Sequence, residues 1–363
     1  MTKYNMPNIP PERHDFVIKQ IASSLNPDLG AREYIVNGIE NYIEGHVARI
    51  NVHVEFNRKK GRMTVLDDGI GMSCEQLNRI GGKVADSLKR FDEKSIGEKG
   101  LGTVSFLGMG DNTSLTMYSR DKNTPKGYLN LFHWLHDKGW TEATQFCEDK
   151  RSLQLGDYKT GTKVIIDGIS EENFTRYLTA RKFRPKLVEM FHPLIKSGNI
   201  NLFLSYVGDK ITTEKIKPLE FTGNKILDEQ ITLRYFNVEA GRDQDGSALV
   251  RIWFDPSNLK GRVRFYNKGV LVHSNLTEIE QFNKMPWKSG RLDGFINEEY
   301  LKLMPSRSAY NQTYRSYFEF INHIDNTHTS NLEKKVKSGT AAFENKELLT
   351  LGKKIMRGLN DIY

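Results

Sequence analysis

One carboxylate and two amides recur at intervals of one helical turn near the start of the chain. Glu33, Asn37 and Asn41 lie four residues apart, so on a helix they form one stripe. An amide oxygen is a neutral, hard ligand of the kind that Mg²⁺ accepts, and a carboxylate one turn earlier can orient and deprotonate a water molecule. The stripe therefore predicts a site for metal-assisted hydrolysis. A surface helix with one polar face has the same spacing and is the alternative.

The elements that would position this stripe can also be predicted from the sequence. Apolar residues recur at steps of three and four through segment 32–43, which is the helical period. Residues 49–56 and 62–66 alternate like strands on either side of a turn at 57–61, and this pattern predicts a hairpin. The second strand of that hairpin ends at Asp67.

An Asp-x-Gly-x-Gly turn follows the hairpin. Gly69 and Gly71 come two and four residues after Asp67, and glycines at this spacing let a backbone turn sharply and approach a flat ligand. A buried carboxylate needs a hydrogen-bond donor, and the adenine amino group is a suitable one. The turn thus predicts a base-binding site, although an isolated turn of this kind also occurs between ordinary elements.

A glycine-rich segment lies further along the chain. Gly97, Gly100 and Gly102 precede residues 103–107, which we expect to open a helix. Free backbone N–H groups at a helix N-terminus favour phosphate. The segment lacks the Gly-Lys-Ser/Thr of a Walker loop and the strand and acidic residue of a dinucleotide-binding turn. It therefore predicts a phosphate-binding loop of another type.

The order of these motifs resembles the GHKL superfamily, which is named for gyrase, the large heat-shock chaperone, histidine kinases and mismatch-repair MutL. Its members have an E-x-x-x-N helix, then D-x-G-x-G, a glycine-rich lid and a G-T-x-V-like strand, which here are Glu33 to Asn37, 67–72, 97–102 and 161–164. The resemblance implies an α+β protein. Its first domain would be a Bergerat-type ATP-binding α/β sandwich, a mixed sheet with helices on one face. A smaller α+β, transducer-like domain would follow.

The resemblance also implies roles for individual residues. Glu33 would be the general base and Asn37 the ligand of Mg²⁺. Asp67 would bind the adenine amino group, supported by Thr162, while the glycine-rich loop would hold the phosphates of ATP. The nucleotide-binding residues implied are Asn37, Asn41, Asp67, Gly69, Gly71, Met72, Gly97, Lys99, Gly100, Leu101, Gly102 and Thr162. The chain departs from the family in one place, because Gly38-Ile39-Glu40 stands where Ala-x-Asp is usual.

The second half of the chain is predicted to consist mainly of strands. Residues 249–254 alternate, and residues 263–266 and 270–272 flank an Asn-Lys-Gly turn that resembles one in MutL and MORC-type proteins. The loop 303–307 precedes a helix at 313–324. In these relatives such a loop sends a cation to the terminal phosphate, which makes Arg307 the second catalytic candidate; a surface arginine that caps a turn is the alternative.

These segments suggest four regions of the chain. We expect an N-terminal arm with the start of a first helix at 1–30, the ATP-binding domain at 31–210, the transducer-like domain at 218–328 and a C-terminal helical tail at 329–363. A helical stretch near 174–194 and a strand at 200–206 would complete the first domain. The polar, lysine-rich segment 212–217 is expected to be the link.

Composition limits the class of protein. The chain has 363 residues, of which 38% are hydrophobic, and no run is apolar enough to cross a bilayer, so a cytoplasmic protein without membrane contact is expected. Cys74 and Cys147 lack metal-ligand spacing. A formal net charge of +8 allows a nucleic-acid partner, although each basic cluster is more often a solvated face. The basic clusters are 58–60, 181–184, 260–262 and 334–337.

Three functions are compatible with these patterns. The first is a slow, Mg²⁺-dependent ATPase that switches conformation through a nucleotide-dependent homodimer, as in MutL, MORC and chaperone relatives. The second is a histidine kinase catalytic domain, which is disfavoured because no helix with a phospho-acceptor histidine precedes Glu33. The third is a nucleotide-binding module without catalysis. The small size suggests one component, with protein partners, of a larger DNA-maintenance or bacterial defence system, whereas a chaperone would need a larger client-binding region.

Overall fold

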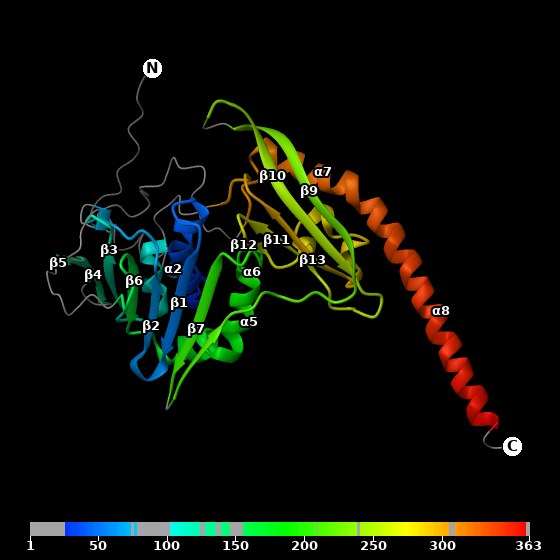
Figure 1. Ribbon diagram of the computed structural model, residues 1–363, viewed down its shortest axis with the longest axis horizontal. Coiled ribbons are helices and arrows are strands. Elements are labelled where there is room, and N and C mark those ends of the chain that lie inside the picture. The colour runs from blue at the N-terminus through cyan, green and yellow to red at the C-terminus, as the bar shows by residue number, and fades with distance from the viewer. Residues whose placement is uncertain are drawn as a thin grey trace. The chain divides into compact units, whose positions relative to one another are not determined.

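The computed structural model describes residues 26–73, 76–77, 102–123, 128–135, 139–145, 155–208, 210–237, 240–304 and 309–360. The chain divides into two compact units, Met1–Pro218 and Leu219–Tyr363. Figure 1 labels their helices and strands. Within the described residues, no helix is both long enough and apolar enough to span a membrane.

The first unit contains an eight-stranded mixed sheet with the order β5-β4-β3-β6-β2-β1-β7-β8. Strands β1 and β7 are parallel, and the other neighbouring strands are antiparallel. The strands are β1 (Ile50–Asn57), β2 (Arg62–Asp67), β3 (Ser114–Arg120), β4 (Tyr128–Leu135), β5 (Gly139–Gln145), β6 (Gly161–Asp167), β7 (Ile200–Val207) and β8 (Ile211–Lys215).

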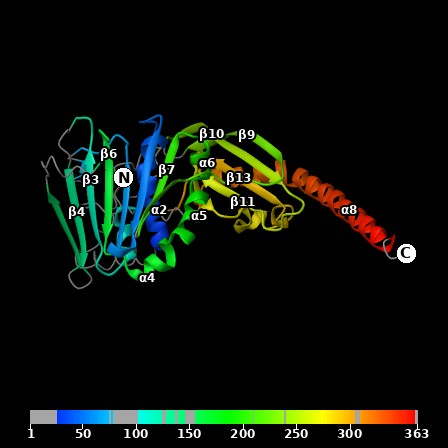
Figure 2. The same cartoon turned by 60° about the horizontal axis from the view of Figure 1, so that its bottom comes forward.

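Alternation along the strands decides which face of this sheet is covered. In β1, Val52, Val54 and Phe56 are buried whereas the residues between them are half-buried, because successive side chains point to opposite faces. The helices α2 (Pro27–Ile43), α4 (Glu171–Asn173), α5 (Ala180–Met190) and α6 (His192–Lys196) belong to this unit (Figure 2). The ring of Phe56 lies 5.1 Å from that of Phe183 in α5, so the apolar face is the helix-covered one.

Helix α2 confirms the helix predicted at 32–43 but begins earlier. Pro27 occupies its first turn, where the missing N–H costs nothing, and Asn26 precedes it with extended backbone. The helix ends at Ile43, shortly before Gly45, whose φ of 77° a residue with a side chain rarely adopts. The predicted hairpin is likewise confirmed as β1 and β2.

Two segments of the first unit differ from the sequence-based expectation. The stretch near 174–194 is not one helix, because the backbone is extended at Thr179 and irregular at Phe191, so that the π-helical turn η3 (Phe174–Leu178), α5 and α6 follow one another. The segment expected as a link forms the edge strand β8, which pairs with β7. Four of its five residues, Thr212, Thr213, Glu214 and Lys215, are polar, which suits an edge strand whose side chains are mostly exposed.

The second unit contains a five-stranded sheet with the order β12-β11-β13-β10-β9. Strands β11 and β13 are parallel, and the remaining neighbours are antiparallel. The elements are β9 (Asn224–Asn237), β10 (Arg242–Phe254), β11 (Val263–Asn267), β12 (Val270–His273), β13 (Leu292–Glu298), α7 (Arg315–Ile324) and α8 (Ser330–Asn360), with 3₁₀ turns at Leu276–Glu278, Glu280–Phe282 and Trp287–Ser289 and a π-helical turn at Asp325–Thr329.

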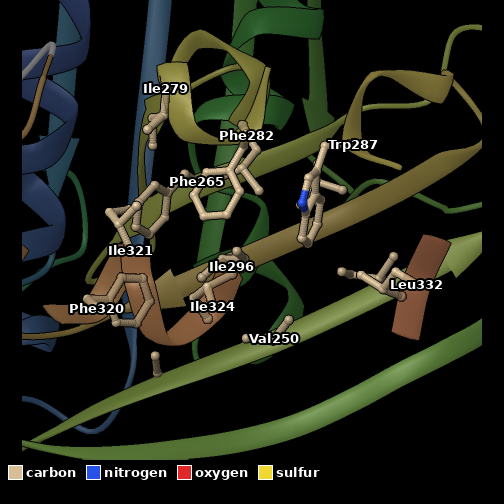
Figure 3. Packing of buried hydrophobic residues seen from close by; sticks show 14 of the residues in the cluster. Val250, Phe265, Ile279, Phe282, Trp287, Ile296, Phe320, Ile321, Ile324 and Leu332 are labelled. Carbon is tan, nitrogen blue, oxygen red and sulfur yellow. The ribbon is translucent and has the colours of Figure 1, made fainter. Parts of the chain in front are cut away.

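The core of the second unit lies between one face of this sheet and the helices. Val250 from β10 and Phe265 from β11 pack with Phe320 and Ile324 from α7 and with Leu332 from α8 (Figure 3). The predicted α+β class is therefore confirmed: a mixed sheet with helices on one face is followed by a second α+β unit.

Candidate functional site

Helix α2 crosses the end of strand β2 that carries Asp67. A Cβ added to Gly38 would lie 3.5 Å from Cβ of Asp67 and 3.5 Å from Cγ1 of Val52, so the helix backbone closely approaches the sheet here. A Cβ added to Gly69 would lie only 2.6 Å from Nδ2 of Asn41. The amide end of the predicted stripe therefore lies against the Asp67 turn.

Asp67 lies in a row of polar side chains on three adjacent strands. It is opposite Thr162 in the register of β2 with β6, and Thr162 is opposite Ser119 in the register of β6 with β3. The hydroxyls of Thr162 and Ser119 are 2.9 Å apart, and the N–H of Met72 donates to Ser119 Oγ at 2.8 Å. Asp67 is 5% exposed, and its Oδ1 accepts from the N–H of Gly69 at 2.9 Å. The row thus joins the turn to the sheet.

Two glycines allow this arrangement. Gly71 has a φ of 71°, and a Cβ there would lie 2.0 Å from the carbonyl oxygen of Arg120. Gly161 has a φ of 138°, and a Cβ there would lie 2.1 Å from the carbonyl oxygen of Asp67. Any side chain at either position would therefore push apart the turn and the strand ends that meet beside Asp67.

Glu33 is also buried, and it is paired with a cation. The Nη2 of Arg32 donates to Oε1 of Glu33 at 3.2 Å, and the two side chains are 6% and 9% exposed. Asn37, one turn further along α2, is half-buried. A buried arginine next to the candidate base was not expected from the sequence.

The segment after the glycine-rich loop packs on α2. It forms a 3₁₀ helix, η2 (Gly102–Met109), whose Phe106 N–H donates to the hydroxyl of Tyr34 at 3.1 Å. A Cβ on Gly30 would lie 2.8 Å from Cε of Met109. Burial raises the pKa of Tyr34, so its hydroxyl stays neutral. Ser105 of η2 also donates to the carbonyl oxygen of Gly30 at 3.4 Å, so η2 is held against the first turns of α2.

Several predicted site residues lie outside the described part of the chain. Of the glycine-rich loop, Gly102 alone is described, as the first residue of η2. The others are Gly97, Lys99, Gly100 and Leu101, together with Arg307 of the loop in the second unit.

The neighbour of Asp67 faces the other side of the sheet. Asp68 accepts from the N–H of Asn51 at 2.7 Å and from its side-chain amide at 2.5 Å, and Asn201 donates to Oδ1 of Asn51 at 2.8 Å. On the same face, His53 lies 2.8 Å from the hydroxyl of Tyr158, and burial lowers the pKa of this histidine although Asp68 opposes the shift. The two adjacent carboxylates therefore have separate surroundings.

The residues present suit magnesium only together with an anionic ligand. Within the described residues, no group of three or more His, Cys, Asp or Glu is placed to hold a metal ion. Mg²⁺ keeps several waters and commonly binds one or two protein oxygens plus phosphates. A single amide oxygen from Asn37 fits that ligand set.

Some of the basic residues noted in the sequence form ion pairs. Arg58 pairs with Glu171, Arg62 with Asp167, and Arg184 with Glu214. In the C-terminal cluster, Lys337 pairs with Glu333 at 2.6 Å. A cation that is paired with a carboxylate is less available to bind phosphate, and nucleic-acid affinity depends mainly on such phosphate contacts.

Sequence reasoning missed Ser119 and Arg32. Ser119 is fully buried in the middle of a row that only the pairing of β3 with β6 creates, and its one local signal was a polar residue at an inward position of an alternating strand. Arg32 carried no signal, because an arginine beside a glutamate on a helix is usually exposed.

Comparison with known proteins agrees with this geometry. Residues 32–147 match the family model described as histidine kinase-, DNA gyrase B- and HSP90-like ATPase. The matched range contains the α2 stripe, the Asp67 turn, the glycine-rich segment and Ser119. A search of the curated proteins finds no match to the chain. The domain that carries the candidate site belongs to the GHKL-type ATPase family.

Proposed function

We propose that the first unit binds ATP with Mg²⁺ and hydrolyses the terminal phosphate. The observation that carries this proposal is the buried Asp67, held by the Gly69 N–H on a turn that lies directly against Asn41 of α2. A carboxylate can accept several hydrogen bonds, and the exocyclic amino group of adenine is a suitable further donor to Asp67. The base would then lie beside Met72 and Thr162.

The α2 stripe would act on the phosphate end of the nucleotide. Asn37 offers Mg²⁺ a neutral oxygen, and the bound ion would neutralise charge on the phosphates. Glu33, one turn earlier, would orient the attacking water and accept its proton. The N-terminal end of η2 would offer backbone N–H groups to a phosphate, and Gly102 is its first residue.

Phosphate release by matched variants tests the proposal. Glu33→Gln keeps the shape of the side chain but removes the base, so we expect at least a tenfold loss of turnover with ATP affinity retained. Glu55→Gln is the control, because Glu55 is a half-buried carboxylate that faces away from α2 on β1. Equal turnover of the wild type and Glu33→Gln would contradict the proposed role of Glu33.

We further propose that ATP drives a conformational switch through a homodimer, with Arg307 reaching the terminal phosphate from the second unit. An arginine that contacts the γ-phosphate stabilises charge only while that phosphate is attached. Arg307→Ala should therefore lower turnover and leave ADP affinity nearly unchanged. On the resemblance alone, the switch would serve a cytoplasmic, multi-component system for DNA maintenance or defence.

A nucleotide-binding module without hydrolysis is the second candidate function. The observation that favours it is the ion pair of Glu33 with Arg32, because a neighbouring cation stabilises the carboxylate and makes it a weaker base toward water. In that case the wild type and Glu33→Gln would release equally little phosphate while both bind ATP.

A further inference from the structure

The C-terminal helix α8 has an inner part that is packed and an outer part that is not. Leu332 and Val336 are each 2% exposed in the core of the second unit, and a Cβ on Gly339 would lie 2.5 Å from the ring of Phe254. From Glu344 to Arg357, by contrast, every residue is exposed. Figures 1 and 2 show this outer part extending away from the sheet of its own unit.

The outer part carries an apolar stripe with a seven-residue repeat. Leu348 and Leu349 are 66% and 69% exposed, and Ile355 and Met356, seven residues later, are 54% and 61% exposed. The pair 341–342, one repeat earlier, consists of two alanines. Scattered exposed apolar residues are ordinary, but a seven-residue repeat is the period with which one helix packs along another.

The stripe also has an open hollow at a glycine. Gly352 lies between the two apolar pairs, and a Cβ there would find nothing within 4 Å. The hollow around it is lined by Asn345, Leu348, Leu349 and Met356 and, at its edge, by the cations Lys353 and Arg357. In paired helices, such a hole between four residues receives a side chain from the facing helix.

We propose that the outer half of α8 is a dimerisation surface that pairs antiparallel with the same segment of a second copy of this chain. If the two-fold axis passes between Thr350 and Leu351, the two helices are aligned so that Leu349 of each copy lies opposite Gly352 of the other. The apolar pair of one helix then fills the hollow of its neighbour, and the contact occurs twice by symmetry. Leu349 and the hollow at Gly352 are complementary in this register, which is why a second copy is the partner that this segment fits.

Charge along the helix favours the antiparallel direction. Lys353, Lys354 and Arg357 lie after the centre of the stripe, whereas Glu344 and Glu347 lie before it together with one lysine, Lys346. An antiparallel pair brings each basic end beside the partner's acidic end. A parallel pair would place three cations beside three cations, which is unfavourable.

The apolar area is sufficient for a weak, specific dimer. Leu348, Leu349, Leu351, Ile355 and Met356 are each more than half exposed, and pairing two copies would bury on the order of 1,000 Å² in total, near the lower bound of specific interfaces. A dissociation constant in the micromolar range is therefore expected. Joining two chains in this way would also raise the effective concentration of their ATP-binding units for one another.

Sedimentation equilibrium of the full chain without nucleotide tests the proposal. We expect the wild type to dimerise, and Leu349→Glu to raise the dissociation constant at least tenfold while the helix content measured by circular dichroism is unchanged. Thr350→Glu is the matched control, because it introduces the same charge one residue further on, on the opposite side of α8, and should leave dimerisation intact.

Gly352→Ala gives a second test in which two explanations predict opposite results. If the outer part of α8 has no partner helix, Gly352→Ala would stabilise α8, because glycine is a poorer helix former than alanine. In the proposed dimer, the added methyl group enters the hollow that receives Leu349 and weakens dimerisation. Stronger dimerisation by Gly352→Ala would overturn the proposed register.

Cross-linking tests the direction of pairing in a background with Cys74 and Cys147 replaced by serine. Antiparallel pairing predicts that a disulfide forms when Leu349→Cys and Gly352→Cys chains are mixed, and a parallel pair predicts efficient linking of Gly352→Cys to itself. A wild type that stays monomeric without nucleotide up to about 100 µM would overturn the proposal, as would a monomer whose α8 binds anionic vesicles through Leu349. Because no nucleotide is present, neither outcome bears on ATP hydrolysis.

Discussion

The guanidinium of Arg32 lies 3.2 Å from the carboxylate of Glu33, and both side chains are at least nine-tenths buried. Neighbouring residues on a helix diverge by about 100°, so the two side chains converge only because the surrounding structure encloses them. The candidate base is therefore held by its own chain. Oε1 of Glu33 accepts from Arg32, and a carboxylate has further acceptor sites at which a water molecule could bind.

The first prediction concerns the strength of this ion pair. Arg32→Ala would leave Glu33 buried without this cation, so we expect the free energy of unfolding to fall by about 1–3 kcal/mol. In the Arg32→Ala background, Glu33→Ala should lower the free energy of unfolding by much less than it does in the wild type. Urea denaturation of the two single variants and the double variant measures the coupling. Additive costs would mean that the pair contributes nothing.

The second prediction separates the two adjacent carboxylates. Asp67→Asn keeps the oxygen that accepts from Gly69 but turns the other acceptor into a donor, so we expect the affinity for a non-hydrolysable ATP analogue to fall at least tenfold. Asp68→Asn, on the opposite face, should leave this affinity nearly unchanged. Isothermal titration calorimetry measures both. A loss of affinity in Asp68→Asn alone would mean that the ligand binds on the face of the sheet opposite Asp67, which would contradict the proposed site.

The third prediction uses two glycines of similar φ. Gly71 and Gly45 have φ values of 71° and 77°, but a Cβ collides with the Arg120 carbonyl only at Gly71. Gly45→Ala should cost about 1 kcal/mol of backbone strain, whereas Gly71→Ala should cost at least about 2 kcal/mol and weaken ATP binding. Thermal melts with and without the nucleotide analogue measure both effects. Equal costs would show that the turn can move away from β3.

The fourth prediction concerns a buried carboxylate of the second unit. Glu298 accepts from Asn267 Nδ2 at 2.6 Å and from the N–H groups of Tyr300 and Leu301 at 2.8 and 2.7 Å. Burial raises the pKa of Glu298 from 4.5 to about 7, although these hydrogen bonds oppose the shift. Between these two pH values the folded state binds more protons than the unfolded state, so stability falls as the pH rises through this window and stays lower above it.

The expected loss from Glu298 is about 3 kcal/mol between pH 4.5 and pH 7. Hydrogen exchange of the β11 and β13 amides at pH 5 and pH 8, corrected for the intrinsic exchange rate, measures the local stability. In Glu298→Gln this part of the pH dependence should disappear, because glutamine does not titrate. A variant that keeps the full pH dependence would assign the effect to other groups.

The sequence by itself determined the local elements of the site. The three- and four-residue apolar steps of 32–43 specify a helix, alternation specifies the β1–β2 hairpin, and glycines mark the turn after Asp67. These features depend on neighbours only a few residues apart, so they can be read without knowing the rest of the chain. The same holds for β7, α7 and the long final helix α8.

Only the tertiary structure decided which distant residues meet. Alternation assigns a strand's faces but not its partners, so nothing in the sequence placed β6 between β2 and β3 or joined Ser119 to Thr162 and Met72. The ion pair of Arg32 with Glu33 likewise arises from burial rather than from spacing. Strand pairing and burial depend on packing across the whole unit, because the apolar face of each strand is satisfied by whichever neighbour the complete fold supplies.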